Sequence, residues 1–193
     1  MKLLSKKYKV LGSALLTGAV LCISFAQNTD PPKPPLKAGY PLMESPHANP
    51  IAINGNYVYV TNTPSATVDV IDSRTEKVVD RIHVGIDPVS IAVRPDGKEI
   101  WVANHVSDSV SVIDSDPKSP TFHVVIDTIQ EFDGNKATNF DEPVGIAFAS
   151  NDKAYVALSS ENQIAVIDVK DRSVTKRLKI NSQDPRAIVV KHG

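Results

Sequence analysis

A Val-Ile-Asp tripeptide occurs three times in this chain, at 70–72, 112–114 and 166–168, so the copies lie 42 and 54 residues apart. A second element precedes each tripeptide at a constant distance and reads VYVTN at 58–62, IWVAN at 100–104 and AYVAL at 154–158. A third element begins with proline and reads PVSIAV at 88–93, PVGIAF at 143–148 and PRAIVV at 185–190. Self-similarity with a period of about 42 residues restricts the chain to a repeat architecture.

Each repeat has the pattern of four short antiparallel strands. In the best-defined copy, residues 90–93 are rich in β-forming side chains, 95–98 form a turn of the hairpin type, and 99–104 make a second strand. The third and fourth strands follow at 109–114 and 125–130. A sheet this small cannot bury both faces alone and must stack on its neighbours, and the period of two excludes a helical repeat. The sequence therefore predicts an all-β protein, a β-propeller of four-stranded antiparallel blades.

The repeat also predicts how the chain is divided. We expect a partial propeller over 46–193, with blades at about 46–86, 87–141 and 142–183 and the start of a fourth at 184. The extra residues between the second and third copies lie in two loops, 115–122 and 131–142, as a packed blade array permits. Three blades and one strand cannot close a ring, so we expect the missing blades to come from a longer chain.

The first 26 residues have the pattern of a secretory signal: lysines at the start, an uncharged stretch over 10–26 and a small-x-small site that ends at Ala26. The alternatives are an uncleaved anchor and a lipoprotein, although Leu21 before Cys22 does not suit lipidation. Residues 27–45 are a proline-rich linker. We therefore predict a periplasmic, extracellular or cell-surface protein that has no membrane contact once the signal is removed.

Cysteine usage and charge exclude several classes of protein. Cys22 is the only cysteine, so the processed chain has no disulfide, no thiolate metal site and no CxxCH haem attachment. The formal net charge of -1 includes four lysines in the first nine residues, which leaves about -5 for the rest. That remainder has no basic excess for binding nucleic acid.

The motif Tyr-Val-Thr-Asn at 59–62, followed by Val-Asp-Val-Ile-Asp at 68–72, resembles the YVTN family of exported β-propeller repeats. The resemblance extends over 46–193. It implies a propeller of seven blades in the periplasm or on the cell surface, where members of the family often serve as surface-layer or binding proteins.

One edge of each blade gathers the loops that enter strand one and leave strand two, and polar side chains collect there. We predict that this edge is the ligand-binding face. Its candidate residues are His47, Asn49, Asn62, Asp87, Asn104, His105, Asp133, Asp141, Glu142, Asp184 and Arg186. The alternative for Asn62, Asn104, Asp87 and Asp184 is a structural role, because these residues recur with the repeat.

The repeat does not require His47 or His105, so these two histidines are the candidates for a metal or a hydrogen-bonded role. Copper and haem sites occur on related propellers, but two histidines are too few to define one. The loop 131–142 carries carboxylates of the kind that calcium uses, without an EF-hand spacing, and we expect it to contribute to partner specificity. We expect His83 and His123 to lie at the surface.

The first function that these features suggest is an exported scaffold that binds a protein or small ligand on one loop face and is not itself catalytic. No GxSxG motif and no serine, histidine and aspartate set indicates catalysis, and no residue is assigned to a catalytic role or to a cofactor. The alternative is the propeller portion of a periplasmic enzyme or redox protein, either lactonase-like or associated with a metal or haem.

Overall fold

The computed structural model describes residues 45–134, 136–137 and 139–191. The predicted signal peptide and all but the last residue of the predicted linker lie outside these residues. Within them, no helix is long and apolar enough to cross a membrane.

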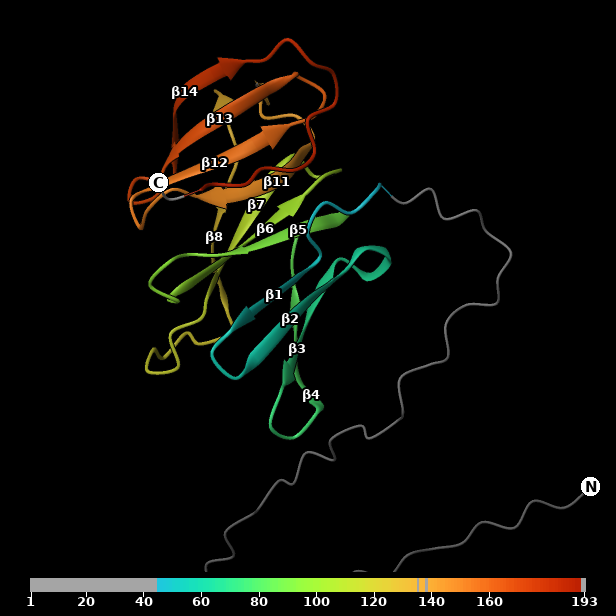
Figure 1. Cartoon of the computed structure of the whole chain (residues 1–193), viewed down its shortest axis with the longest axis vertical. Coiled ribbons are helices and arrows are strands. Elements are labelled where there is room, and N and C mark those ends of the chain that lie inside the picture. The colour runs from blue at the N-terminus through green and yellow to red at the C-terminus, as the bar shows by residue number, and fades with distance from the viewer. Residues whose placement is uncertain (1–44, 135, 138, 192–193) are drawn as a thin grey trace, which may run out of the picture. The chain divides into compact units, whose positions relative to one another are not determined.

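Three four-stranded antiparallel sheets make up the described part of the chain (Figure 1). The first sheet contains β1 (Ile51–Asn54), β2 (Tyr57–Asn62), β3 (Thr67–Asp72) and β4 (Lys77–His83). The second contains β5 (Pro88–Val93), β6 (Glu99–Asn104), β7 (Ser109–Asp114) and β8 (Val125–Ile129). The third contains β11 (Pro143–Phe148), β12 (Lys153–Leu158), β13 (Gln163–Asp168) and β14 (Ser173–Lys179). We call them blades one, two and three.

The strand register repeats from blade to blade. The second and third strands pair Tyr59 with Val70, Trp101 with Val112 and Tyr155 with Val166. The third and fourth strands share an irregularity directly after the valine of each Val-Ile-Asp tripeptide, as a recurrent β-bulge would produce. The predicted fold class is therefore confirmed, because each blade is the same four-stranded antiparallel unit.

Neighbouring blades bury apolar faces against each other. Between blades one and two the core contains Tyr59, Val68 and Ile82 from the first sheet, packed on Ile91 and Val102 of the second. Burying an aromatic or branched aliphatic side chain of this kind contributes roughly 1.5–3 kcal/mol relative to leaving it exposed. Stacking of blades, which the repeat predicted, is thus the source of the core.

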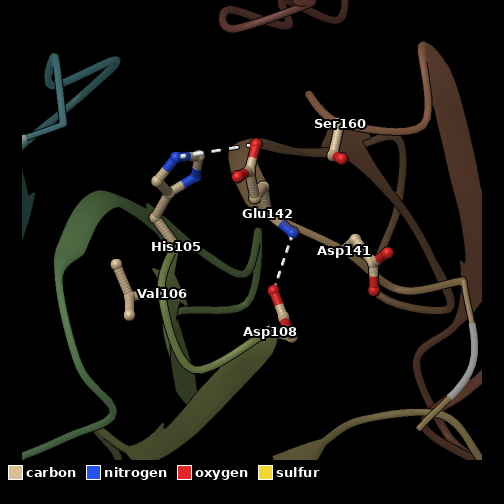
Figure 2. A pocket seen from close by; sticks show the side chains of 6 residues that line it. All are labelled: His105, Val106, Asp108, Asp141, Glu142 and Ser160. Atoms are coloured by element: carbon tan, nitrogen blue, oxygen red, sulfur yellow. Dashed lines mark hydrogen bonds and ion pairs between the residues drawn. The ribbon is translucent and has the colours of Figure 1, made fainter.

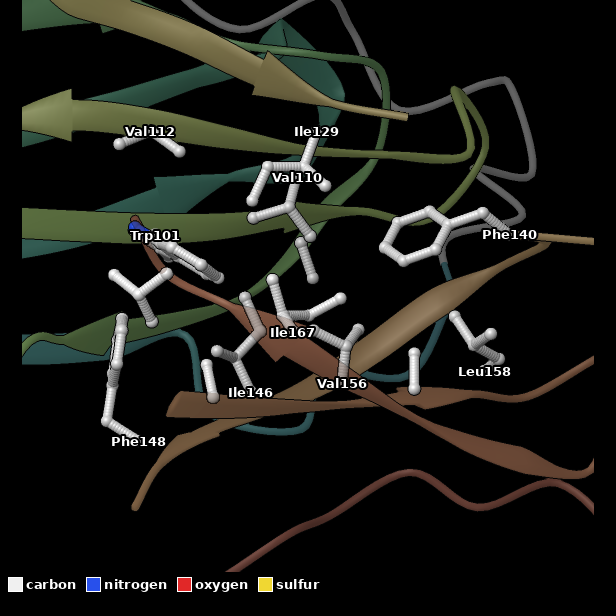
Figure 3. Packing of buried hydrophobic residues seen from close by; sticks show 14 residues of the cluster. Trp101, Val110, Val112, Ile129, Phe140, Ile146, Phe148, Val156, Leu158 and Ile167 are labelled. Carbon is white, nitrogen blue, oxygen red and sulfur yellow. The ribbon is translucent and has the colours of Figure 1, made fainter. Parts of the chain in front are cut away.

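A larger core lies between blades two and three (Figure 3). Trp101 is fully buried, and its ring meets that of Phe148 edge-on with 4.9 Å between the centroids. In the view of Figure 3, Phe140 lies at the opposite end of the cluster from Trp101. Phe140 belongs to the loop that links the two blades, so this acidic loop is anchored by a buried aromatic ring.

The two predicted insertions take different forms. Loop 131–142 contains a short hairpin of β9 (Phe132–Asp133) and β10 (Lys136–Ala137). Residues 115–124 form a series of turns that carries Phe122 and His123 to blade one, where the imidazole of His123 lies 3.0 Å from the Tyr59 hydroxyl. The prediction that His123 lies at the surface is therefore wrong, since 7% of its side chain is exposed. His83 is exposed, as predicted.

The start of the fourth repeat runs beside blade three without forming a strand in the described residues. A Cβ atom added to Gly145 would lie 2.4 Å from the backbone oxygen of Arg186, so the segment passes directly against β11. Residues 184–191 have the strand-forming sequence of the first strand of a blade but make no sheet hydrogen bonds, because a first strand pairs with the second strand of its own blade. A fourth blade remains a prediction.

Candidate functional site

The loops that enter strand one and leave strand two meet at one edge of the blades, held by a backbone hydrogen bond that recurs. The amide of His105 donates to the carbonyl of Asp87 at 2.9 Å, and the amide of Ser159 donates to the carbonyl of Glu142 at 3.1 Å. Asp87 and Glu142 both precede a proline and both have a positive φ, 62° and 51°. A positive φ costs conformational free energy in a residue other than glycine, and it persists where the surrounding structure holds the backbone in that conformation.

Among the ionisable candidate residues, His105 is the most buried, with 7% of its surface exposed. Its Nδ1 atom is buried and has no hydrogen-bond partner among the described residues. Its Nε2 atom lies 4.0 Å from Oε2 of Glu142, beyond direct hydrogen-bond distance. Figure 2 shows the imidazole turned toward Glu142 across the seam between blades two and three. A buried imidazole nitrogen without a hydrogen-bond partner is rare in folded proteins.

Glu142 is held in place by hydrogen bonds to both blades. Its amide donates to Oδ1 of Asp108 at 2.9 Å, and the hydroxyl of Ser159 lies 3.1 Å from both its carbonyl oxygen and its carboxylate, so it can donate to either. Asp108 belongs to the turn after β6, while Ser159 follows β12. Glu142 is therefore held by both blades, through its amide by Asp108 and through its carboxylate by Ser159.

These groups line a pocket of about 310 Å³ at the seam. Its walls are His105, Val106, Asp108, Asp141, Glu142 and Ser160. Three of the six side chains are carboxylic acids and none is a lysine or arginine, so the pocket favours hydrogen-bond donors and positive charge. The sequence did not single out Asp108 or Ser160, although both follow a second strand as His105 does.

The structure brings together three of the predicted face residues in this pocket, namely His105, Asp141 and Glu142. His47 instead hydrogen bonds through Nε2 to the hydroxyl of Thr63 at 2.5 Å, and that hydroxyl donates to the carbonyl of Pro88. His47 is thus committed to joining blade one to blade two. Within the described residues no group of three or more His, Cys, Asp or Glu side chains could hold a metal ion.

The other predicted face residues make structural contacts or lie outside the pocket lining. Asn49 donates to the carbonyl of Ile91 at 3.0 Å, and Asn104 donates to the hydroxyls of Ser109 and Ser111. These three hydrogen bonds tie Asn49 to β5 and the end of β6 to β7. The remaining contacts involve Asn62 with Thr67, Arg186 with Asp184 and with the carbonyl of Pro46, the backbone bond of Asp87, and Asp133 within β9.

The stacked four-stranded sheets and the shared loop edge define this chain as part of a β-propeller. Residues 35–184 match the family model described as the cytochrome D1 heme domain. The chain belongs to this family.

Two individual proteins are similar to this chain over part of their length. Protein NirF of Pseudomonas aeruginosa is 29% identical over 130 residues, which cover 66% of this chain and 30% of NirF. A chain of the hydrazine synthase of Kuenenia stuttgartiensis is 30% identical with a TM-score of 0.61, and the match covers 77% of this chain and 42% of that one. The chain therefore spans less than half of either protein.

A third similarity concerns the fold alone. The β-propeller domain of Myceliophteria thermophila Cps50 (Swd1) is 12% identical with a TM-score of 0.58, over 71% of this chain and 45% of that domain. The comparisons confirm the propeller class that the YVTN resemblance implied. The family that they identify is the cytochrome D1 heme domain, which corresponds to the redox alternative better than to a cofactor-free scaffold.

Proposed function

We propose that this chain is the propeller portion of a haem-associated redox protein and that its loop face, at the seam between blades two and three, takes part in binding a haem-type tetrapyrrole. The family match over residues 35–184 is the observation that carries the proposal.

Of the residues that the structure describes, His105 fits such a group best. Imidazole is a frequent axial ligand of haem iron, and a bound haem supplies one-electron chemistry. Among the described residues, the Nδ1 atom of His105 has no hydrogen-bond partner and its Nε2 atom makes no direct hydrogen bond to the nearby Glu142 carboxylate, so the imidazole is not already committed as that of His47 is.

The acidic wall of the pocket limits how a tetrapyrrole could lie. Haem-type groups carry carboxylates, and Asp108, Asp141 and Glu142 would repel them at this point. We therefore propose that the carboxylate edge turns away from the seam. Glu142, held by Ser159 and Asp108, would then accept a hydrogen bond beside His105.

A haem titration tests this proposal. Haem is added to the purified chain and the Soret band is followed for the wild type, His105→Ala and His83→Ala. We expect His105→Ala to weaken haem binding about tenfold or more and to change the Soret band. His83→Ala, which replaces an exposed histidine, is the matched control and should bind haem as the wild type does. A tenfold loss corresponds to about 1.4 kcal/mol of binding free energy.

Two results would count against it. If the wild-type chain left the haem spectrum unchanged, the chain would not bind haem. If the wild type and His105→Ala bound haem with equal affinity, His105 would not belong to the site. In the first case the scaffold that binds another small ligand or a protein becomes the better description.

We also propose export to the periplasm, on the basis of the lysine-rich start, the uncharged stretch and the small residues before Gln27. N-terminal sequencing of the protein recovered from the periplasm should begin at Gln27. Recovery of Met1, or of a lipidated Cys22, would contradict this. The closer assignment to YVTN-type repeats belongs to the same proposal and rests on the motif at 59–62.

A further inference from the structure

The seam between blades two and three can be compared with the seam between blades one and two, because the repeat places equivalent residues at both. Ala66, Asp108 and Asn162 occupy the same turn position after the second strand, and all three have a positive φ, 53°, 48° and 53°. Asp87 and Glu142 occupy the same position before the proline of the first strand. Side chains that the repeat requires should recur at these positions, and side chains that differ need another explanation.

The turn position after the second strand does not require a charge. Oδ1 of Asp108 accepts a hydrogen bond from the amide of Glu142 at 2.9 Å, and Oδ1 of Asn162 accepts one from the amide of Asp184 at 2.8 Å. The two hydrogen bonds are equivalent, and the asparagine makes its bond as a neutral side chain. Ala66 takes the same backbone conformation without any polar side chain. The negative charge of Asp108 is therefore not a requirement of the fold.

Two further side chains distinguish the seam between blades two and three. Asp141 stands where the other seam has Ile86, and His105 stands where it has Thr63. The hydroxyl of Thr63 is hydrogen bonded to His47, whereas Nδ1 of His105 has no hydrogen-bond partner among the described residues. More than nine-tenths of His105 is buried, and the residue lines the pocket. Thr63 is thus satisfied within the chain, and the imidazole of His105 is not.

The three carboxylates beside this imidazole form an excess of negative charge. Asp108, Asp141 and Glu142 all line the pocket, and among the side chains that the structure describes no lysine or arginine pairs with them. Carboxylates held close together repel one another, and a bound cation relieves that repulsion. Within the described residues no group of three or more such side chains could hold a metal ion. A larger cation with several N–H donors therefore suits this pocket better than a metal ion does.

The size of the pocket and its apolar wall indicate what kind of cation would fit. Its volume of about 310 Å³ is roughly ten times the share of one water molecule in the liquid. Val106 supplies the apolar part of the lining and is 59% exposed. Figure 2 shows Val106 on one side of the pocket and Asp141 on the other. An alkyl chain can lie along such an apolar surface while its charged end reaches a carboxylate.

We propose that this pocket binds an organic cation, namely an ammonium or guanidinium group on a short alkyl chain. The N–H groups of the cation donate to the three carboxylates and to the imidazole of His105, and the alkyl chain lies against Val106. A free amine and the lysine or arginine side chain of a partner protein both offer this chemistry. The inference does not rest on haem binding, because the charge comes from the carboxylates and the test uses no haem.

An NMR titration of the full chain tests the proposal. The labelled chain is titrated with diaminopentane, with agmatine and with Nα-acetyl-lysine amide, which stands for a lysine within a protein. The cations should shift the amide signals of residues 105–108, 141–142 and 159–160, while pentanol, an alkyl chain without a charge, should leave them unchanged. Binding of Nα-acetyl-lysine amide as tight as that of the free amines would identify a partner's side chain as the source. Binding of the free amines alone would identify a small molecule.

Neutral variants of the carboxylates give the sharpest readout. Asp108→Asn should keep its hydrogen bond to the Glu142 amide, as Asn162 does at the equivalent position, and should weaken diaminopentane binding about threefold. Asp141→Asn should have a similar effect, and raising the salt concentration to about 0.5 M should weaken binding to the wild type. Glu76→Gln, which neutralises an exposed carboxylate of blade one, is the matched control and should bind as the wild type does.

Three outcomes would overturn the proposal. The first is a wild-type chain whose pocket signals do not move with any of the cations. The second is pentanol binding as tight as diaminopentane binding, which would make the charge irrelevant. The third is an unchanged affinity for diaminopentane in both Asp108→Asn and Asp141→Asn. The Soret titration is a separate measurement, so a failure of haem binding would leave these results as they are.

Discussion

Glu99 joins blades two and three at the edge opposite the pocket, and its removal should have a large effect on stability. Its carboxylate accepts hydrogen bonds from Nε1 of Trp101 at 2.9 Å, from Arg94 at 3.1 Å and from Arg172 of blade three at 3.2 Å. Only 9% of Glu99 is exposed. Glu99→Ala would leave an indole N–H and two guanidinium groups without this acceptor.

The magnitude follows from how far solvent reaches these groups. Breaking a fully buried ion pair costs about 3–5 kcal/mol. The Arg94 and Arg172 side chains are 21% and 20% exposed, and Arg172 also pairs with Asp127, so part of that cost is relieved. We expect Glu99→Ala to lower the free energy of unfolding by about 2–3 kcal/mol, or roughly 5–10 °C in Tm for a domain of this size.

Denaturant and thermal unfolding of the wild type, Glu99→Ala and Glu99→Gln measure this effect. The glutamine retains an acceptor for Trp101 and loses the charge, so it should fall between the other two. Glu76→Ala, which removes an exposed carboxylate, is the matched control and should stay within about 0.5 kcal/mol of the wild type. A loss of less than about 0.5 kcal/mol in Glu99→Ala would refute the role of Glu99 as an inter-blade tie.

Three other perturbations should have distinct outcomes. Burial lowers the pKa of His123, and the nearby Asp80 carboxylate opposes this shift only in part, so the unfolded chain binds the proton more readily than the folded chain does. The free energy of unfolding should therefore be highest above about pH 6.5 and fall as the pH drops toward 5. His123→Gln should flatten that decline. Phe140→Ala removes a ring that is 1% exposed and should cost about 3–5 kcal/mol, with faster proteolysis of loop 131–142 as the local readout. Gly145→Ala would place a Cβ atom 2.4 Å from the Arg186 carbonyl oxygen, so hydrogen exchange should become faster at 186–188 and unchanged at 99–104.

The repeat was sufficient to predict the fold because its information is local. Alternation over 99–104 and the turn at 95–98 specify a hairpin, and the recurrence of Val-Ile-Asp sets the order of the strands. The face that gathers His105 and Glu142 was predicted in the same way, from the direction of consecutive strands.

Contacts between blades could not be predicted in this way. His123 follows an insertion and is buried because that loop reaches back to Tyr59, a contact between residues 64 positions apart. Asp108 belongs to the pocket because its carboxylate accepts the Glu142 amide from the next blade. Such partners depend on lateral packing of sheets, for which a single sequence has no periodic signal.

The seam pocket has a mechanical consequence. One wall belongs to the turn after β6 and the other to the loops around β11 and β12, so a molecule seated there touches both blade two and blade three. A bound molecule that fits the pocket would act as a crosslink between the two blades. It would resist their separation and raise the melting temperature of the domain. A molecule too large for about 310 Å³ would force the blades apart at this edge, where Phe140 packs at the end of the core away from Trp101.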